Sequence, residues 1–344
     1  MRPVPAMGSG TLALATYAHP KGAQFDLRVA AESGYEGVAC VDDAARAALL
    51  YIAIWQRHQL PWAREAAEGL LTFTCAMQMA DGAFANFIAT WEGERQLNTP
   101  TSRPGQGPWQ ARAMHALARG VAAFGTDSYR AAFDAGLPIL AQPTPYLDVR
   151  ALSAIATLEY WQATAEPSAG ALALGWAREI ADTRIGDVLP DVAGSTDVHL
   201  WGHLQEAALA RIGEAFEIPT LISMAARSAD AILVPAVGRA FAGSRALAFD
   251  VSCTIAGLDA VAAATGDAHY THHATAARAW FEGRNAAGRA VYDRERGLVA
   301  DGIDGDRISE NSGAESNIEG ALALVDDLPW SEIHAAMAGQ CSSA

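Results

Sequence analysis

The fold of this chain is decided by segments of the kind found at residues 43–58, which read DAARAALLYIAIWQRH. Alanine and larger apolar residues recur there at three- and four-residue steps, the spacing that places them on one face of an α-helix. Alanine also favours the helical conformation and lets neighbouring helices approach closely. The segment therefore predicts a helix that packs against other helices.

The same pattern recurs along the chain and predicts helices over residues 43–58, 62–79, 109–124, 128–140, 150–164, 169–184, 198–216, 218–233, 251–265, 269–285, 314–325 and 331–338. Alternating strand patterns with hairpin turns are nearly absent. Consecutive helices form pairs of roughly 50–60 residues, with short links inside a pair and longer polar links between pairs. Six such hairpins close most economically into a ring. We therefore expect an all-α fold, an (α/α)6 toroid over residues 1–344 as a single domain, with a two-domain α-solenoid as the alternative.

Composition limits the partners of the protein. Of its 344 residues, 51% are hydrophobic, enough apolar surface to offset the entropy of ordering the chain. The net charge of -15 argues against binding to nucleic acid or to an anionic membrane surface. No run of about 20 apolar residues predicts a membrane span. Without a recognisable secretory signal, and with no disulfide or metal spacing among its cysteines, the chain is expected to be cytoplasmic; the cysteines are Cys40, Cys75, Cys253 and Cys341.

Two acidic motifs stand where predicted helices begin. Asp42 and Asp43 open the first helix, and Arg46 follows one turn later, where it can pair with either carboxylate. Their alternative role is to cap the helix and complement its dipole. Glu315 and Glu319 lie one turn apart on a late helix, where a buried pair would raise one pKa, as a general acid requires. Ser312 with Glu315 also fits a capping box, which is a purely structural role.

Three further sets of residues lie at or near the long polar loops. His199 and His203 would share one helix face with Glu206 nearby, but the Glu does not directly follow the first His as the zincin signature requires, so we expect no metal. Hydrogen bonding to sugar hydroxyls or proton transfer by one His is the functional alternative. The remaining candidates are Trp109 and Arg112 on one helix face, Asp250 at a helix start, and the loop tryptophans Trp91 and Trp201. No phosphate-binding loop or dinucleotide fingerprint is present, so no cofactor is expected.

Three motifs in order resemble a bacterial family of six-hairpin, glycosidase-like proteins that often occur beside or fused to glycosyltransferases and mannoside-processing enzymes. The matching stretches are DDAARA at residues 42–47, QARAMHAL at 110–117 and NSGAES at 311–316. The family commonly has Asn where this chain has Ala44, and Gly where it has Ala111. The resemblance implies an (α/α)6 barrel that acts on carbohydrate.

From the resemblance and the residues together we expect a glycoside hydrolase, inverting in its stereochemistry, in which two carboxylates flank the scissile bond. Glu315 would be the general acid or base and Asp43 its partner, while Asp42 would orient a hydroxyl or the attacking water. Trp91, Trp109 and Trp201 would stack on sugar rings, and hydroxyls or an acidic substituent would be bound by Arg46, Arg112 and His203. Further candidates for substrate binding are His199, Asp250 and Glu319. A sugar isomerase or epimerase that uses His199 and His203, a polysaccharide lyase and a non-catalytic glycan-binding toroid remain alternatives.

Overall fold

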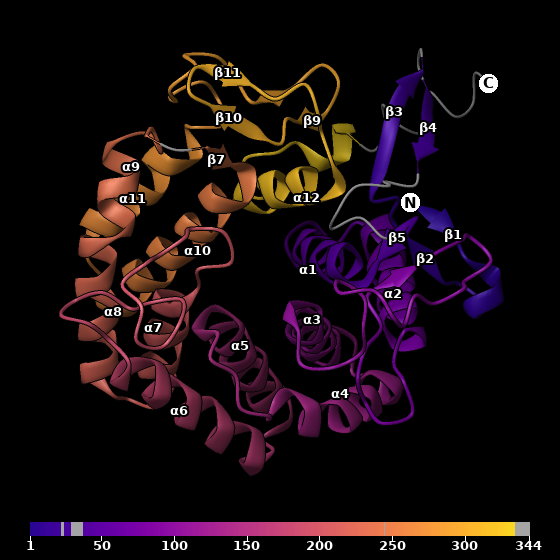
Figure 1. Ribbon diagram of the computed structural model, residues 1–344, viewed down its shortest axis with the longest axis horizontal. Coiled ribbons are helices and arrows are strands. Elements are labelled where there is room, and N and C mark those ends of the chain that lie inside the picture. Colours follow the sequence, from indigo (N-terminus) through magenta and orange to yellow (C-terminus); the bar gives the residue numbers. More distant parts are fainter. Residues whose placement is uncertain (22–23, 29–36, 244, 334–344) are drawn as a thin grey trace.

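Six helices form the inner wall of a ring in the computed structural model, which describes residues 1–21, 24–28, 37–243 and 245–333. The inner helices are α1 (Val41–His58), α3 (Pro108–Phe124), α5 (Leu147–Thr164), α7 (Gln205–Ala215), α10 (Ala248–Thr265) and α12 (Ala314–Ala323). Each packs against the next, and α12 packs against α1, which closes the ring (Figure 1).

A second layer of helices lies outside the first. It consists of α2 (Pro61–Ala76), α4 (Asp127–Leu140), α6 (Pro167–Asp182), α8 (Pro219–Ala231) with the short α9 (Leu233–Gly238), and α11 (Ala268–Arg278). The long outer helices each pack on the inner helix that precedes them in the chain. The predicted all-α toroid of helical hairpins is therefore confirmed. The last predicted helix, 331–338, is helical at 331–333, and its remaining residues lie outside the described part of the chain.

Alanine allows the inner helices to pack tightly. In α1, Ala44, Ala45, Ala47 and Ala48 are all buried, because the helix is covered on its outer side by α2 and on its flanks by α3 and α12. In α5 and α10 almost the whole first half of the helix is buried in the same way. Small side chains allow neighbouring inner helices to approach closely. Larger apolar side chains can then fill the space between the inner and the outer helices.

Short antiparallel strands connect the helices on the side where the inner helices begin. Two-stranded pairs are formed by β1 (Arg2–Pro3) with β2 (Leu12–Ala13), β3 (Tyr17–Lys21) with β4 (Gln24–Arg28), β5 (Ala39–Cys40) with β6 (Phe87–Ile88), and β8 (Tyr292–Asp293) with β9 (Leu298–Val299). Three strands pair in the order β11 (Arg307–Ile308), β10 (Gly302–Asp304), β7 (Ala246–Leu247). A 3₁₀ turn, Pro5–Met7, follows β1.

The β5–β6 pair matters most for function because it leads directly into α1. Gly37, just before β5, allows close packing there, since a Cβ atom on it would lie 2.2 Å from the carbonyl oxygen of Ile88. Any larger residue at that position would push β5 away from β6. The first turn of α1, with its two aspartates, is thus fixed in place by a strand pair.

Three of the predicted helices differ clearly in extent from the observed ones. The helix predicted over 269–285 ends at Arg278 and is followed by turns. The helix predicted over 198–216 begins only at Gln205, and the residues before it form a loop. The helix predicted over 218–233 ends at Ala231, and α9 then starts a new direction. Pro235 explains that break, because its ring would clash with the carbonyl group of Ala231 in a continuous helix.

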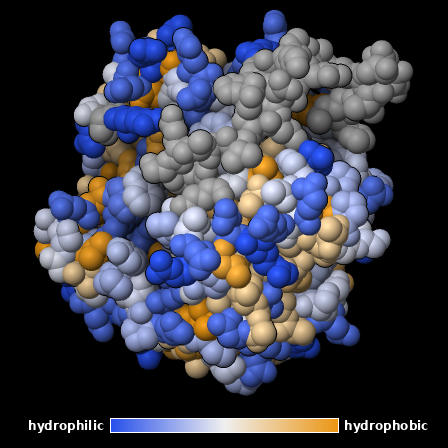
Figure 2. All heavy atoms as spheres, turned by 45° about the vertical axis from the view of Figure 1, so that its right-hand side comes forward, coloured by the Kyte–Doolittle hydropathy of each residue, from blue (hydrophilic) through white to orange (hydrophobic). Residues whose placement is uncertain are grey.

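Two described stretches are long and apolar enough for a membrane span by length and composition alone, Pro219–Gly238 and Ala248–Thr265. The second is α10, whose apolar surface is accounted for by packing against α7, α11 and α12 within the ring. Figure 2 shows one outer face of the molecule, where hydrophilic side chains predominate and hydrophobic ones form small, separated patches.

Candidate active site

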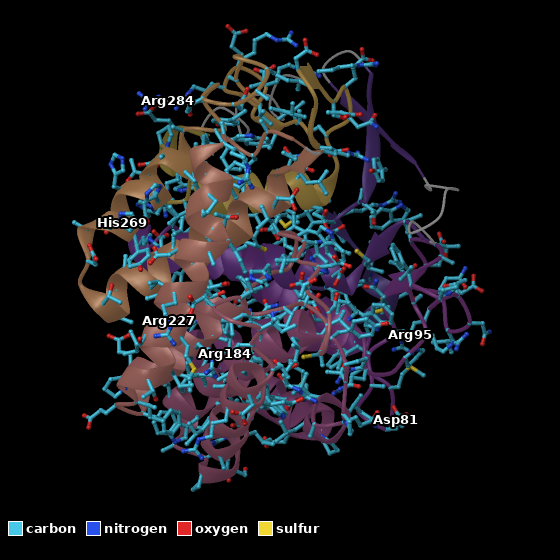
Figure 3. All side chains as sticks on the ribbon, turned by 60° about the vertical axis from the view of Figure 1, so that its left-hand side comes forward. Asp81, Arg95, Arg184, Arg227, His269 and Arg284 are labelled. Carbon is cyan, nitrogen blue, oxygen red and sulfur yellow. The ribbon has the colours of Figure 1, made fainter. Side chains whose placement is uncertain are left out.

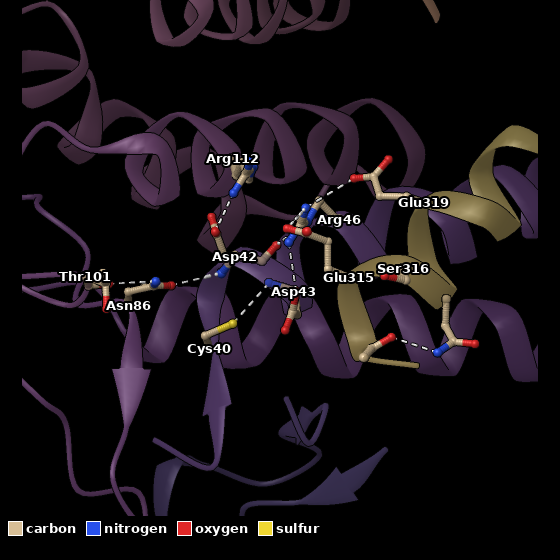
Figure 4. Close-up of polar contacts among 12 residues, drawn as sticks. Cys40, Asp42, Asp43, Arg46, Asn86, Thr101, Arg112, Glu315, Ser316 and Glu319 are labelled. Atoms are coloured by element: carbon tan, nitrogen blue, oxygen red, sulfur yellow. Dashed lines mark hydrogen bonds and ion pairs between the residues drawn. The ribbon is translucent and has the colours of Figure 1, made fainter. Parts of the chain in front are cut away.

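One buried guanidinium joins three carboxylates at the start of the inner helices. Arg46 Nη2 donates to Asp43 Oδ1 at 2.9 Å, and Arg46 Nη1 lies 2.8 Å from Glu315 Oε2 and 3.3 Å from Glu319 Oε1 (Figure 4). The Arg46 side chain is only 6% exposed. Asp43 and Glu319 are also buried, whereas the Glu315 side chain is 43% exposed. Of the three carboxylates, Glu315 is the one that solvent or a substrate can reach.

The fourth carboxylate, Asp42, has a different partner. Its Oδ2 atom forms an ion pair with Arg112 Nη1, and its side chain is 20% exposed. Asn86 holds the backbone there, because its Oδ1 accepts the Asp42 N–H and its carbonyl accepts the Val41 N–H. Asp42 Oδ1 has no hydrogen-bond partner among the described residues. This buried oxygen of the Asp42 carboxylate is therefore an unused acceptor.

The charges in this cluster do not balance, since four carboxylates surround two guanidiniums. Burial raises the pKa of Asp43, an effect that Arg46 opposes and Glu315 reinforces. Burial likewise raises the pKa of Glu319, against the opposing effect of Arg46. For Arg46, desolvation by itself would lower the pKa, but Glu315 and the other carboxylates raise it well above its usual value. The cluster therefore keeps Arg46 charged and favours protonation of its buried acids.

The start of α12 is held by a residue outside the three sequence motifs. Asp301 Oδ1 accepts the Gly313 N–H at 2.7 Å and the Ser316 hydroxyl at 2.8 Å. The predicted capping box between Ser312 and Glu315 is wrong. Ser312 Oγ accepts from the side-chain amide of Asn317, and the Glu315 carboxylate is drawn to Arg46 instead.

Phe249 packs against both arginines of this cluster. Its ring centroid lies 5.2 Å from Cζ of Arg46 and 5.3 Å from Cζ of Arg112, so the two guanidiniums share one aromatic ring. The sequence pointed only to its neighbour Asp250. The two arginines, Phe249 and Glu319 all line a cavity of about 480 Å³ that we call the central cavity.

The central cavity is also lined by a second charged cluster, which was not predicted from the sequence. Glu159 Oε1 accepts from Arg211 at 2.6 Å, and Glu159 Oε2 lies 3.1 Å from His115 Nε2 and 3.8 Å from Arg119 Nε. Although burial alone would raise the pKa of Glu159, His115 and the two arginines hold it well below its usual range. His115 belongs to the 110–117 motif but was not singled out in it, and Arg119, Glu159 and Arg211 lie inside predicted helices outside all three motifs, so the sequence did not show that these four side chains meet.

His203 does not share a helix face with His199, contrary to the sequence prediction. Both precede α7, and the His203 side chain is fully buried. Its Nδ1 atom lies 2.7 Å from Asp191 Oδ1 and its Nε2 atom 2.9 Å from Glu206 Oε2. Burial opposes the charged form, but the two carboxylates raise the pKa of His203 to about 10. A charged, enclosed imidazole with both nitrogens occupied acts as an anchor for the loop.

That anchored loop presents an aromatic pair to solvent. The rings of His199 and Trp201 stack with centroids 3.7 Å apart and planes 5° from parallel. His199 Nδ1 donates to the Trp201 carbonyl at 2.8 Å, and the His199 N–H donates to Asp191. Trp201 is 45% exposed, unlike most large apolar side chains of the chain. Asp250 lies nearby in the first turn of α10, where Oδ2 accepts the Leu247 N–H.

The two other candidate tryptophans lie apart from the carboxylates. Trp91 is half-buried and packs beneath the guanidinium of Arg2, whose Cζ lies 4.7 Å from the ring centroid. Trp109 donates its indole N–H to the Phe84 carbonyl and lines a separate pocket of about 350 Å³ with Arg103. Neither ring therefore faces the Arg46 cluster.

Metal and disulfide chemistry were not expected from the sequence. Within the described residues, no group of His, Cys, Asp and Glu side chains has the arrangement of a metal site. Cys40, Cys75 and Cys253 are free thiols, and the fourth cysteine, Cys341, lies outside the described residues. Burial raises the pKa of the Cys40 and Cys253 thiols well above the usual value, so both stay protonated.

Comparison with known proteins shows that solved structures of carbohydrate-active enzymes share this fold. No family model matches this chain, and no curated protein matches it in sequence. Similar solved structures include a sugar epimerase from a ruminal bacterium, with a TM-score of 0.68 and 12% identity over 91% of this chain and 92% of that one.

Two further similar structures are named for other classes of enzyme. An inactive variant of an α-1,6-mannanase of Salegentibacter sp., in complex with α-1,6-mannotetrose, has a TM-score of 0.60 and 10% identity, covering 83% of this chain and 87% of that one. A polysaccharide lyase has a TM-score of 0.60 and 10% identity, covering 84% of this chain and 92% of that one. At these identities the similarity shows the (α/α)6 fold alone, and function has to be argued from the site.

Proposed function

We propose that this protein is a carbohydrate-active enzyme, a glycoside hydrolase whose reacting groups are Asp42 and Glu315. The observation that supports this most is the pair of partly exposed carboxylates in the first turns of α1 and α12, each held by its own arginine, Arg112 and Arg46. Hydrolysis of a glycoside needs two such groups. One gives a proton to the leaving oxygen as the C–O bond breaks, and the other acts on the opposite side of the sugar ring.

Asp43 takes a different role in this proposal from the one expected from sequence. Its carboxylate is buried and bound to Arg46, and its backbone N–H donates to Cys40 Sγ at 3.4 Å. A group enclosed in this way acts on the substrate only through its neighbour. Asp43 therefore positions Arg46, and Arg46 in turn orients Glu315. The α-1,6-mannanase with the same fold is inactive in a variant changed at two consecutive aspartates, and Asp42 and Asp43 are also consecutive.

The isomerase or epimerase alternative rests on proton transfer by a histidine next to a sugar carbonyl. The geometry favours it less, because both nitrogens of His203 are occupied by carboxylates and its side chain is fully buried. His199 is reachable, but its ring is stacked on Trp201 with Nδ1 bound to a carbonyl. The lyase alternative needs a base beside an acidic sugar and shares the same carboxylates, so product analysis has to separate it from hydrolysis.

Three readouts on one set of substrates separate these reaction classes. The full-length protein is incubated with oligosaccharides of mannan, glucan and galactan and with pectin and alginate fragments. A new reducing end without ultraviolet absorbance indicates hydrolysis, and absorbance near that of an unsaturated sugar indicates a lyase. Incorporation of deuterium from solvent into free mannose or glucose indicates an epimerase or isomerase. The hydrolase proposal fails if either of the last two signals appears without bond hydrolysis.

A further inference from the structure

A second hollow lies at the first turn of α10 and shares no lining residue with the central cavity. This side groove has a volume of about 730 Å³ and runs between the loop that carries His199 and Trp201 and the segment from α9 to β7. Asp250 faces it, whereas the preceding residue, Phe249, lines the central cavity. Burial raises the pKa of Asp250, and the charge of Glu315 adds to that rise.

The walls of the side groove have the composition of a sugar subsite. The stacked rings of His199 and Trp201 form one side, and Trp201 is 45% exposed although its loop is anchored by His203. Aromatic faces of this kind bind the apolar face of a sugar ring. Apolar residues complete the lining, among them Ile232, Pro235 and Phe241.

Positive charge is the second property of the groove. Arg239 and Arg245 both line it and both are exposed, and neither guanidinium has a hydrogen bond or ion pair to a side chain or carbonyl among the described residues. By contrast, Arg46 and Arg112 at the carboxylate cluster are fully engaged with acids. The one carboxylate of the groove lining, Asp250, is occupied by the Leu247 N–H. Two guanidiniums that have no acidic partner among the described residues line one groove of a chain with net charge -15, and such groups can bind an anionic ligand.

From these observations we infer that the side groove is a subsite for a sugar residue that carries an anionic group, bound by Trp201 and His199 through its ring and by Arg239 and Arg245 through its charge. The inference rests on the proposed function and extends it, because it makes the preferred substrate an acidic glycan. The anionic group is a carboxylate, a phosphate or a sulfate, which the guanidiniums would bind in the same way.

Binding can be measured without turnover, through the indole N–H signal of Trp201 in the nitrogen-15 spectrum of the full-length protein, assigned with Trp201→Phe. The probes are glucuronate, glucose 6-phosphate and glucose 6-sulfate against glucose, and mannuronate and mannose 6-phosphate against mannose. We expect at least one acidic sugar to shift the Trp201 signal at a concentration tenfold or more below that of its neutral counterpart. Raising the salt concentration should weaken this binding, because the ion pairs are exposed.

Two variants test the assignment of the charge. In Arg239→Gln/Arg245→Gln the acidic sugar should bind no better than the neutral one, while the neutral sugar binds as before. Arg284→Gln removes another exposed arginine that has no ion pair among the described residues, at the edge of the molecule in Figure 3, and should leave the preference unchanged.

Equal binding of acidic and neutral sugars by the unmodified protein would overturn the inference, as would inorganic phosphate that shifts the signal as strongly as any acidic sugar. Hydrolysis of neutral glycans with no acid preference would also overturn it while leaving the proposed function in place. An acid preference in a protein without hydrolase activity would support the subsite and refute the hydrolase.

Discussion

The guanidinium of Arg46 and the carboxylate of Glu315 meet at 2.8 Å across 269 positions of sequence, and their contact joins α1 to α12 where the ring closes. The first and last inner helices of the ring are therefore tied together by the same groups that form the candidate active site. Stability and activity are coupled at this point, and variants of single residues should separate the two.

Arg46→Gln should strongly destabilise the protein. The change leaves the buried carboxylates of Asp43 and Glu319 without their cation, and removing one partner of a buried ion pair costs about 3–5 kcal/mol. Denaturant unfolding at pH 7 measures the loss. The matched control is Arg64→Gln, whose ion pair with Glu68 is exposed on both sides, and it should cost less than about 1 kcal/mol. Equal losses in the two variants would contradict the structural role of Arg46.

Glu319→Gln should stabilise the protein at pH 7, because burial raises the pKa of Glu319 and so opposes its charged form in the folded state, whereas glutamine carries no charge there. Burial raises the folded-state pKa of Glu319, so its contribution to stability is greatest below the unfolded value and is lost as pH rises through the folded one. The gain should therefore shrink towards pH values below about 4, where Glu319 is itself protonated. A variant that is less stable than the parent at pH 7 would contradict this account.

His203 gives stability a second pH dependence. Its folded pKa of about 10 lies above the usual 6.5, so the folded state binds the extra proton between these values. The stabilisation is complete below pH 6.5 and is lost as pH rises through about 10. Unfolding free energies measured from about pH 6 to 10 should fall in the parent and fall less steeply in His203→Gln. His58→Gln, at an exposed position on α1, serves as the control and should keep the slope of the parent.

Trp201→Ala should weaken substrate binding with little effect on stability. Trp201 is 45% exposed, so its removal leaves no buried void, while the loss of ring stacking should raise KM about tenfold. Leu97→Ala, an exposed apolar residue on a different loop, is the control for surface truncation. An unchanged KM with a lowered melting temperature would assign Trp201 a structural role instead.

The ring could be predicted from the sequence because its cause is local. Segments such as residues 43–58 repeat the helical spacing of small and apolar residues. These helices follow one another in pairs, and a closed ring is the most economical way to pack six such pairs. The error at 198–204 has a nonlocal cause. Asp191 binds both the His199 N–H and the His203 imidazole, which holds these residues in a loop, and a helical pattern in the sequence does not reveal that contact.

The candidate site was predictable only in part for the same reason. The motifs placed Asp42, Asp43, Arg46 and Glu315 at helix starts, and the fold brings all four together. Their partners come from elsewhere in the chain, however. Asp301 rather than Ser312 holds the start of α12, and Phe249 lies between two guanidiniums that are far apart in sequence. Which carboxylate is enclosed and which is accessible depends on these contacts.

The central claim is that Asp42 and Glu315 act directly on a glycosidic bond while Asp43 acts through Arg46. The most direct measurement is the turnover of Asp42→Asn, Glu315→Gln and Asp43→Asn on the oligosaccharide that the parent cleaves fastest, by release of reducing ends, with folding of each variant checked by its unfolding transition. The account predicts a loss of about a hundredfold or more in kcat for the first two variants, and a smaller loss for Asp43→Asn with a shifted pH profile. Full turnover in folded Asp42→Asn and Glu315→Gln would contradict it.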